Sequence, residues 1–276
     1  MKFQYLGTAA YEGVPSLFCK CEVCKYSRKA KGRNLRSRTQ AIIDNKILID
    51  FPADAFAHSM HYGIDYTDIN TCIITHFHSD HLYPNDMFIR SPIKGLLDKN
   101  SPLTVYASAP SVDRIETLAT KLDYTMGDYL VTETVVPNKP FCADGYKITP
   151  LKADHDPECE PVFYIIEKDG KSILYAHDTG YFPEETWEYI EKNSCKFNMV
   201  SFDCTCGILP IRSGHMGFDA CVEARDRLRK IGAITNDTVC ILNHFSHNGK
   251  VHYDSMCKIA EEKGFIVSYD GMTVDL

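Results

Sequence analysis

The segment from Thr75 to Leu82 constrains this chain more than any other. It reads Thr-His-Phe-His-Ser-Asp-His-Leu, so three imidazoles and one carboxylate fall within six residues. Imidazole and carboxylate groups suit zinc, manganese or iron, and the apolar run Cys72–Thr75 predicts a strand that ends in this loop. The alternative is a chance cluster of polar loop residues. The side chains that we interpret as ligands of two adjacent metal ions are His76, His78, Asp80 and His81.

Other polar side chains follow apolar, β-rich runs in the same way. Asp50, Asp178 and His244 come directly after such runs, and Asp203 ends one. Side chains at strand ends gather on one edge of a sheet, where loops leave them open to solvent. We therefore expect distant residues to complete a site that one segment cannot fill alone. Asp203 is expected to be a supporting carboxylate rather than a ligand.

Short β-rich runs alternate with helical patterns along the chain. The dipeptides Asp44–Asn45 and Asp169–Gly170 predict two hairpins, and hairpins mixed with strand–helix units predict two sheets covered by helices. Strands are expected over Phe3–Leu6, Gln40–Ile43, Ile47–Asp50, Cys72–Thr75, Leu103–Ala107, Val162–Glu167, Ser172–His177, Met199–Asp203, Val239–Asn243 and Ile266–Tyr269. Helices are expected over Ala53–His61, Ser111–Leu122, Pro183–Lys192, Phe218–Lys230 and Asp254–Lys263.

The composition is that of an ordinary folded globular protein. A formal net charge of -7 argues against broad binding of nucleic acids, which needs a basic face. No signal peptide and no membrane span are recognisable, so we expect a cytoplasmic protein whose 12 cysteines are buried or bind metal. With no repeat and no linker, residues 1–276 are expected to form a single domain.

The pattern His76-x-His78-x-Asp80-His81 resembles the signature of the metallo-β-lactamase superfamily, and the similarity extends over most of the chain. The resemblance implies an α/β fold, a four-layer αβ/βα sandwich with two mixed sheets flanked by helices. It also implies a division of the ligands. Metal one would be held by His76, His78 and His155, and metal two by Asp80, His81 and His244, while Asp178 would bridge both. Asp50 would orient the segment Thr75–Leu82, which we call the His loop.

The run from Cys19 to Cys24 offers three thiolates in the spacing C-x-C-x-x-C. A structural zinc needs four tetrahedral ligands, and His247, three residues after His244, is our candidate for the fourth. The alternative is three ordinary thiols. The cysteine cluster together with the last histidines resembles the PhnP-type phosphodiesterases, whose named member cleaves phosphoribosyl cyclic phosphate. A related group tied to pyrroloquinoline quinone biosynthesis has the same cluster, so the substrate stays open.

A phosphodiesterase mechanism follows from these ligands as a hypothesis. Two ions would share a hydroxide and aim it at phosphorus, with Asp80 and Asp178 among the catalytic groups. His215 lies before a predicted helix and is our candidate for a general acid or a phosphate contact, although a capping or surface histidine is the alternative. The expected substrate is a small cyclic or nucleotide-like phosphodiester, and the expected cofactors are two divalent ions (zinc or manganese, possibly iron) and one structural zinc.

Two alternative functions and the roles of two segments stay open. Hydrolysis of a thioester or lactam is an alternative, as is an accessory protein of cofactor biosynthesis, because fold alone does not choose a reaction. The resemblance also suggests a homodimer. The basic segment Lys25–Arg38 is either a solvated loop or an attraction for anionic substrates. We expect the stretch Leu82–Asn100 to wall the pocket, with Phe88, Ile89 and Leu96 as its apolar surface.

Overall fold

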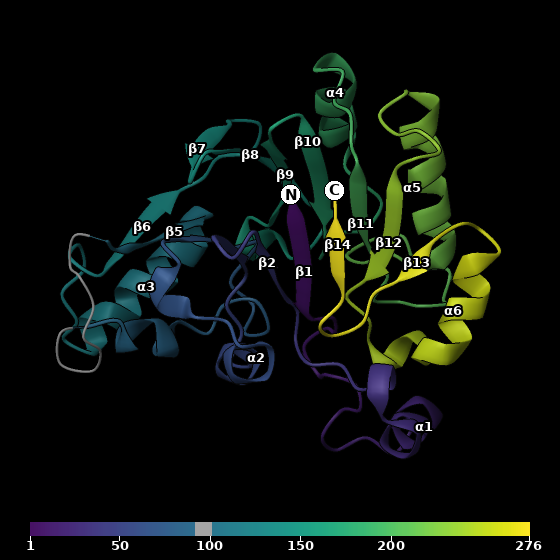
Figure 1. Cartoon of the computed structure of the whole chain (residues 1–276), viewed down its shortest axis with the longest axis horizontal. Helices are drawn as coiled ribbons and strands as arrows, with labels where there is room; N and C mark the ends of the chain where they lie inside the picture. The colour runs from purple at the N-terminus through teal and green to yellow at the C-terminus, as the bar shows by residue number, and fades with distance from the viewer. Residues whose placement is uncertain (92–100) are drawn as a thin grey trace.

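The computed structural model describes residues 1–91 and 101–276, and within them the strands form two seven-stranded sheets that face each other (Figure 1). The first sheet has the spatial order β14 (Thr273–Asp275), β1 (Lys2–Gly7), β2 (Gln40–Ile43), β3 (Ile47–Ile49), β4 (Thr71–Ile73), β5 (Leu103–Ala107) and β6 (Leu130–Thr134). The second has the order β13 (Ile266–Val267), β12 (Val239–Asn243), β11 (Met199–Asp203), β10 (Lys171–Ala176), β9 (Val162–Lys168), β8 (Tyr146–Lys152) and β7 (Phe141–Ala143). Both sheets are mixed, since β3 to β6 and β10 to β13 pair in parallel and the other neighbours pair antiparallel.

Strand residues alternate between two faces because successive side chains of an extended chain point in opposite directions. In β10, Ile173 and Tyr175 lie in the core between the two sheets, whereas Leu174 and Ala176 pack toward the helices. In β2, Ile42 lies in a third core on the outer face of the first sheet. Each sheet is therefore buried on both faces, which explains why its strands read as continuous apolar runs.

Helices cover the outer face of each sheet. The first sheet is covered by α2 (Ala55–Tyr62) and α3 (Ala109–Lys121), which contribute Ala55 and Ile115 to its core. The second sheet is covered by α4 (Glu184–Lys192), α5 (Phe218–Lys230) and α6 (Tyr253–Glu261), which contribute Trp187, Leu228 and Met256. The layers are helix, sheet, sheet and helix (Figure 1), so the predicted αβ/βα sandwich is confirmed.

Type I′ turns connect the predicted hairpins. Asp44 and Asn45 have φ of 50° and 54°, and Asp169 and Gly170 have φ of 49° and 74°, as this turn requires. A third turn of the same kind, Asp144–Gly145, joins β7 to β8 and was not predicted. None of the helices in residues 1–91 and 101–276 combines the length and the apolar character that crossing a membrane requires.

Candidate metal centre

The polar residues at the strand ends lie together on one edge of the sandwich. Asp50 directly follows β3, Asp178 lies two positions beyond the end of β10, and His244 directly follows β12. All three have positive φ, of 63°, 50° and 63°. This backbone conformation is uncommon for residues other than glycine, and its recurrence at three strand ends is typical of a functional site.

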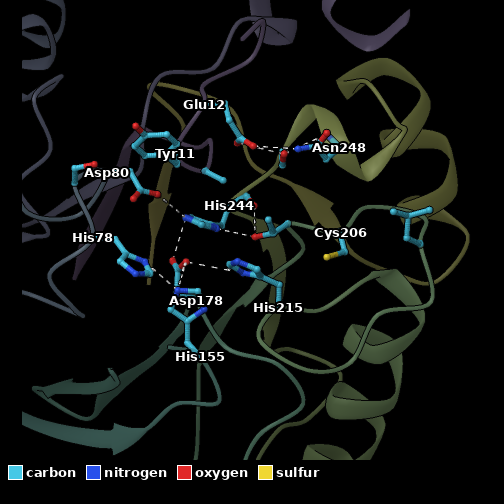
Figure 2. Close-up of a pocket in the computed structure, with 15 residues that line it drawn as sticks. Tyr11, Glu12, His78, Asp80, His155, Asp178, Cys206, His215, His244 and Asn248 are labelled. Atoms are coloured by element: carbon cyan, nitrogen blue, oxygen red, sulfur yellow. Dashed lines mark hydrogen bonds and ion pairs between the residues drawn. The ribbon is translucent and has the colours of Figure 1, made fainter. Parts of the chain in front are cut away.

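A cavity of about 520 Å³ opens at this edge, and Figure 2 shows the side chains that line it. Candidate ligands form one part of the lining, and segments near the N-terminus, after β11 and after β12 form most of the rest. The lining residues are Ala10, Tyr11, Glu12, His78, Ser79, Asp80, His155, Asp178, Thr205, Cys206, Leu209, His215, His244, Ser246 and Asn248.

Three imidazole nitrogens face one another beside this cavity. Nε2 of His76 lies 2.9 Å from Nδ1 of His78, and Nε2 of His155 lies 3.2 Å from the same Nδ1 atom. Nitrogen ligands about 2.0–2.1 Å from a tetrahedral zinc are about 3.3 Å apart. The spacing therefore fits one divalent ion held by three nitrogens, which are the ones that the resemblance implies for metal one.

A second group consists of buried polar atoms without a hydrogen-bond partner among the described residues. They are Nε2 of His81, Nε2 of His244 and Oδ2 of Asp178. Oδ2 of Asp178 lies 2.9 Å from the first nitrogen and 3.0 Å from the second, and Oδ2 of Asp80 lies 3.3 Å from Nε2 of His81. An unsatisfied buried polar group costs roughly 1–3 kcal/mol, so their convergence indicates a bound divalent ion, which suits these donors.

Asp178 lies between the two groups. Its Oδ2 atom faces His81 and His244, whereas its Oδ1 atom lies 3.8 Å from Nε2 of His155. Each carboxylate oxygen therefore faces a different set of nitrogens. This arrangement is the one expected of a carboxylate shared by two ions, as the resemblance implies for this residue.

Burial and neighbouring charges set the protonation of these groups. Burial lowers the pKa of His76 well below its usual value and also lowers the pKa of His155. Burial alone would raise the pKa of Asp178, but the imidazoles of His244 and His81 outweigh it and hold this pKa well below its usual value. His76 and His155 are thereby neutral and Asp178 is ionised, which are the forms that bind metal. Burial would also lower the pKa of His81, but the carboxylates of Asp178, Asp80 and Asp50 outweigh it and raise this pKa well above its usual value.

Backbone and hydroxyl groups orient two of the imidazoles from behind. Nδ1 of His155 donates a hydrogen bond of 3.0 Å to the carbonyl oxygen of Gly214. Nδ1 of His244 lies 2.7 Å from the hydroxyl of Thr205, which also donates to the carbonyl oxygen of His244. With Nδ1 engaged in both rings, Nε2 is the nitrogen that remains for a metal.

Asp50 supports the His loop from a fully buried position. Its carboxylate accepts hydrogen bonds from Nδ1 of His81 at 2.7 Å and from the backbone N–H of Thr75 at 2.8 Å. We expect Asp50→Ala to weaken metal binding about 10- to 100-fold, the usual effect of losing a partner behind a ligand. Competition with a chelator measures this affinity, and wild-type affinity in the variant would contradict the orienting role.

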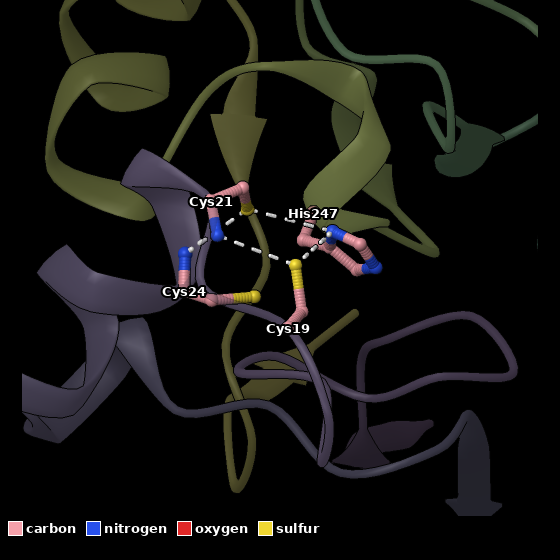
Figure 3. A group of neighbouring side chains, drawn as sticks. All are labelled: Cys19, Cys21, Cys24 and His247. Carbon is pink, nitrogen blue, oxygen red and sulfur yellow. Dashed lines mark hydrogen bonds between the residues drawn. The ribbon is translucent and has the colours of Figure 1, made fainter.

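A separate cluster contains Cys19, Cys21, Cys24 and His247, whose donor atoms lie within 4.8 Å of one another (Figure 3). The Sγ atoms of Cys19 and Cys21 are each 3.6 Å from Nδ1 of His247. A tetrahedral zinc with Zn–S of about 2.3 Å and Zn–N of about 2.0–2.1 Å places sulfur and nitrogen about 3.5 Å apart. The four predicted residues thus come together with a spacing that fits zinc.

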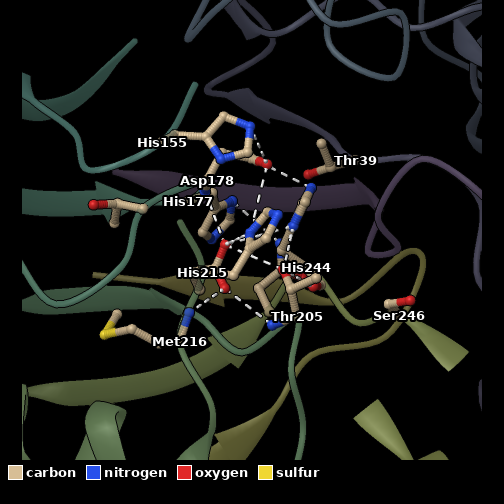
Figure 4. A network of polar contacts seen from close by, with 12 residues as sticks. Thr39, His155, His177, Asp178, Thr205, His215, Met216, His244 and Ser246 are labelled. Atoms are coloured by element: carbon tan, nitrogen blue, oxygen red, sulfur yellow. Dashed lines mark hydrogen bonds and ion pairs between the residues drawn. The ribbon is translucent and has the colours of Figure 1, made fainter. Parts of the chain in front are cut away.

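His215 lies beside the candidate metal ligands His155, Asp178 and His244 (Figure 4), and its ring contacts Asp203. Nδ1 of His215 is 3.1 Å from Oδ2 of Asp203 and 3.9 Å from Oδ1 of Asp178. Burial would lower the pKa of His215, but the Asp203 carboxylate outweighs it and raises this pKa to about 9. Asp203 is fully buried and also accepts hydrogen bonds from the backbone N–H groups of Thr205 and Met216, which fits a supporting carboxylate.

Some cavity residues carry no sequence motif. Glu12 and Asn248 contact each other across 236 positions of the chain, so no local pattern could pair them. Asp156, by contrast, lies 3.2 Å from Nε2 of His78 and directly follows His155, so the motif around that histidine could have identified it.

The expectation that residues 82–100 wall the cavity is wrong for their described part. Phe88 is buried in the core of the first sheet, and Ile89 lines a separate hollow. None of residues 82–91 lines the cavity, and Leu96 lies outside the described residues.

The basic segment 25–38 does not line the cavity either. Arg28 donates to the carbonyl oxygens of Ser16 and Cys19, and Arg36 is buried and donates to the hydroxyl of Thr8. These contacts favour a structural role for both arginines over attraction of substrates.

A helix-flanked pair of mixed sheets with clustered histidine and aspartate side chains at its strand ends defines a metal-dependent hydrolase fold. The profile of the β-lactamase superfamily domain matches residues 45–241, and the chain belongs to this family. The match runs from just before β3 into β12, so it includes the His loop and Asp178, whereas His244 lies beyond its end.

Three known proteins that are similar to this chain have different names and lengths. An octanoyltransferase from Porphyromonas gingivalis is 25% identical over 291 aligned positions, which cover 96% of this chain and 52% of that protein. This chain therefore spans about half the length of that curated relative.

Two solved structures share the fold at low identity. The Zn²⁺-bound structure of PqqB from Methylobacterium extorquens has a TM-score of 0.76 and 17% identity, over 100% of both chains. A diphosphatase from the PhnP family has a TM-score of 0.75 and 19% identity, over 100% of this chain and 97% of the other.

Proposed function

We propose that this chain is a dinuclear-metal-dependent hydrolase that cleaves a small cyclic or nucleotide-like phosphodiester. The two donor groups joined by Asp178 would hold the two ions, and His215 would serve as general acid or phosphate contact. Bound divalent ions supply an activated water and positive charge that faces the phosphoryl oxygens. The similarity to the PhnP-family diphosphatase supports a fold that such an enzyme can have. The proposed reaction itself is argued from the residues of this chain.

The position of His215 carries this proposal. Its Nδ1 atom faces the buried carboxylate of Asp203, which leaves Nε2 for the cavity that the ring lines. An imidazole held in this way can give a proton to a leaving oxygen or bind a phosphoryl oxygen. Asp203 fixes the ring, because its own hydrogen bonds to Thr205 and Met216 anchor it to the loop beyond β11.

The leaving group distinguishes a phosphodiester from a thioester. A thiol with a pKa of about 8.5 leaves readily as the thiolate, whereas an alkoxide needs a proton as the bond breaks. A proton donor beside the candidate metal ligands would therefore accelerate cleavage of an alkyl phosphodiester and would contribute little to hydrolysis of a thioester.

We expect His215→Ala to reduce kcat for an alkyl phosphodiester about 10²- to 10⁴-fold, the usual contribution of general acid catalysis. The loss should be much smaller for a nitrophenyl phosphodiester, since nitrophenolate leaves without a proton. The measurement compares both substrates for the wild type and the variant, together with metal content by elemental analysis.

His61→Ala is the matched control for this prediction, because His61 is exposed on α2 and lies outside the cavity. This variant should keep the wild-type kcat for both the alkyl and the nitrophenyl phosphodiester. Equal losses on the alkyl and nitrophenyl substrates would contradict proton donation and favour a phosphate contact. Loss of metal from His215→Ala would contradict both roles.

Acyl substrates are the second candidate class, and the octanoyltransferase relative is the observation that keeps them in view. The octanoyltransferase is a longer protein, and this chain spans about half of its length. A panel of aryl phosphodiesters, cyclic nucleotides, thioesters and a chromogenic lactam, each with zinc or manganese added, separates the classes. Activity on thioesters alone would overturn the proposed phosphodiesterase.

A further inference from the structure

Glu12 lies in a cavity wall that the proposed mechanism does not use. Nδ2 of Asn248 donates a hydrogen bond of 3.0 Å to Oε1 of Glu12, and Oγ of Ser246 donates one of 3.4 Å to Oε2. The backbone N–H of Asn248 donates in turn to the hydroxyl of Ser246 at 3.1 Å. These contacts hold the carboxylate in place, while 29% of its side chain stays exposed.

This wall lies apart from the proposed proton donor. In Figure 2, Glu12 and Asn248 lie on one side of His244, and His155 and His215 lie on the other. A substrate whose phosphoryl group reaches the metal ligands would extend another part toward Glu12. Tyr11, which is 59% exposed, adds an aromatic face at the same side of the cavity.

The charge along the cavity is uneven. None of the described lining residues is a lysine or an arginine, and the two other acidic ones, Asp80 and Asp178, are candidate metal ligands. Positive charge would therefore come from the ions at one end, while Glu12 places a carboxylate without a lysine or arginine partner in the lining at the other. Nε2 of His247 lies 4.0 Å from Oε1 of Glu12, so the cluster of Cys19, Cys21, Cys24 and His247 borders the same wall.

Arg38 does not offset this charge. Its Nε atom donates to the carbonyl oxygen of Tyr11 at 2.8 Å, and its guanidinium pairs with Asp54 at 3.2 Å. No contact between Arg38 and Glu12 is found among the described residues, and the neighbours of the Glu12 carboxylate are the hydroxyl of Ser246, the amide of Asn248 and, at 4.0 Å, Nε2 of His247.

We propose that Glu12 determines specificity, so that the cavity accepts a phosphodiester whose remaining part is rich in hydroxyl groups and carries no further negative charge, such as a sugar, and rejects one that carries a second phosphate. This inference rests on the proposed function. A carboxylate accepts hydrogen bonds from hydroxyl groups and repels a phosphate brought close to it. The ring of Tyr11 offers an apolar face to the same sugar.

The test measures binding and does not depend on turnover. Glucose 6-phosphate, glucosamine 6-phosphate and glucose 1,6-bisphosphate are titrated calorimetrically into the metal-loaded protein. The wild type should bind glucose 6-phosphate at least about tenfold more tightly than the bisphosphate, which corresponds to about 1.4 kcal/mol. In Glu12→Gln this ratio should fall to about threefold or less, and Glu133→Gln, at an exposed position of β6, should keep the wild-type ratio.

Three results would overturn the inference. They are a bisphosphate that binds the wild type as tightly as glucose 6-phosphate, a ratio that Glu12→Gln leaves as it is, and no measurable binding of any of the three sugars. Weaker binding of glucosamine 6-phosphate than of glucose 6-phosphate to the wild type would also overturn it, because a carboxylate that repels a phosphate should attract an ammonium group. Hydrolysis of phosphodiesters is scored separately, so a failure of the proposed function is recognised independently of the binding ratio.

Discussion

Asp178→Ala is expected to reduce phosphodiester hydrolysis at least about 10³-fold, equivalent to about 4 kcal/mol of transition-state stabilisation, and to lower the metal content by at least one ion per chain. The reason is the position of this carboxylate between the two donor groups, 2.9 Å from Nε2 of His81 and 3.8 Å from Nε2 of His155. Without it, His81 and His244 lose the charge that pairs with them in a buried site. Elemental analysis and steady-state kinetics on the same preparation measure both effects.

Two further variants make this result specific. Asp178→Asn keeps the volume of the side chain and removes its charge. If the charge holds the ions, the metal content of this variant should fall nearly as far as that of the alanine variant. Asp219→Ala removes an exposed carboxylate from the start of α5 and should keep both metal and activity. If Asp178→Ala retained two ions and wild-type turnover, the dinuclear centre would be refuted.

The candidate centre could be predicted from the sequence because its chemistry lies at the ends of strands. Asp50, Asp178 and His244 each follow an apolar run, and such runs are recognisable without knowing which strands pair. The order of the sheets then brings these ends together. The strand pairs β3–β4 and β10–β11–β12 are parallel neighbours, so their ends meet on one edge.

Elements with mixed or polar character could not be predicted in the same way. The strand β6 ends in Glu133 and Thr134, which are exposed, and β7 has three residues. Proline is unfavourable inside a strand, yet Pro150 of β8 lies beyond the three residue pairs that β7 makes with β8, so its missing N–H costs no hydrogen bond on that side. The Asp144–Gly145 turn was the signal that could have identified this hairpin.

The helix α1 (Glu22–Ala30) was missed because four of its nine residues are charged and few are apolar. Its buried face consists of Val23, Cys24 and Ser27, which is too small an apolar stripe to recognise. The side chain of Cys21 accepts a hydrogen bond from the backbone N–H of Cys24 and caps the helix, so the cysteine spacing serves the helix as well as the cluster. Tertiary contact completes the helix, since the ring of Tyr26 stacks on His252 with centroids 3.7 Å apart.

Cys24→Ser is expected to remove one zinc ion per chain and to lower the thermal unfolding midpoint by roughly 8–16 °C. Loss of a structural metal is among the few single changes that cost about 4 kcal/mol or more, and each kcal/mol shifts the midpoint by about 2–4 °C in a protein of this size. Cys24 is buried at the start of α1, so the zinc would connect this helix to the loop after β12 through His247. Differential scanning calorimetry and elemental analysis measure the two effects.

The location of the lost ion distinguishes the two proposed metal sites. His244 and His247 lie on the same short loop, but their donor atoms belong to different clusters. The variant should therefore lose one zinc and keep the ions of the dinuclear centre, while Cys142→Ser, at an exposed thiol of β7, should change neither metal content nor stability. Unchanged zinc content and an unchanged midpoint in Cys24→Ser would show that these thiols do not form a structural metal site, because a folded tetrahedral zinc cannot lose a sulfur ligand without cost.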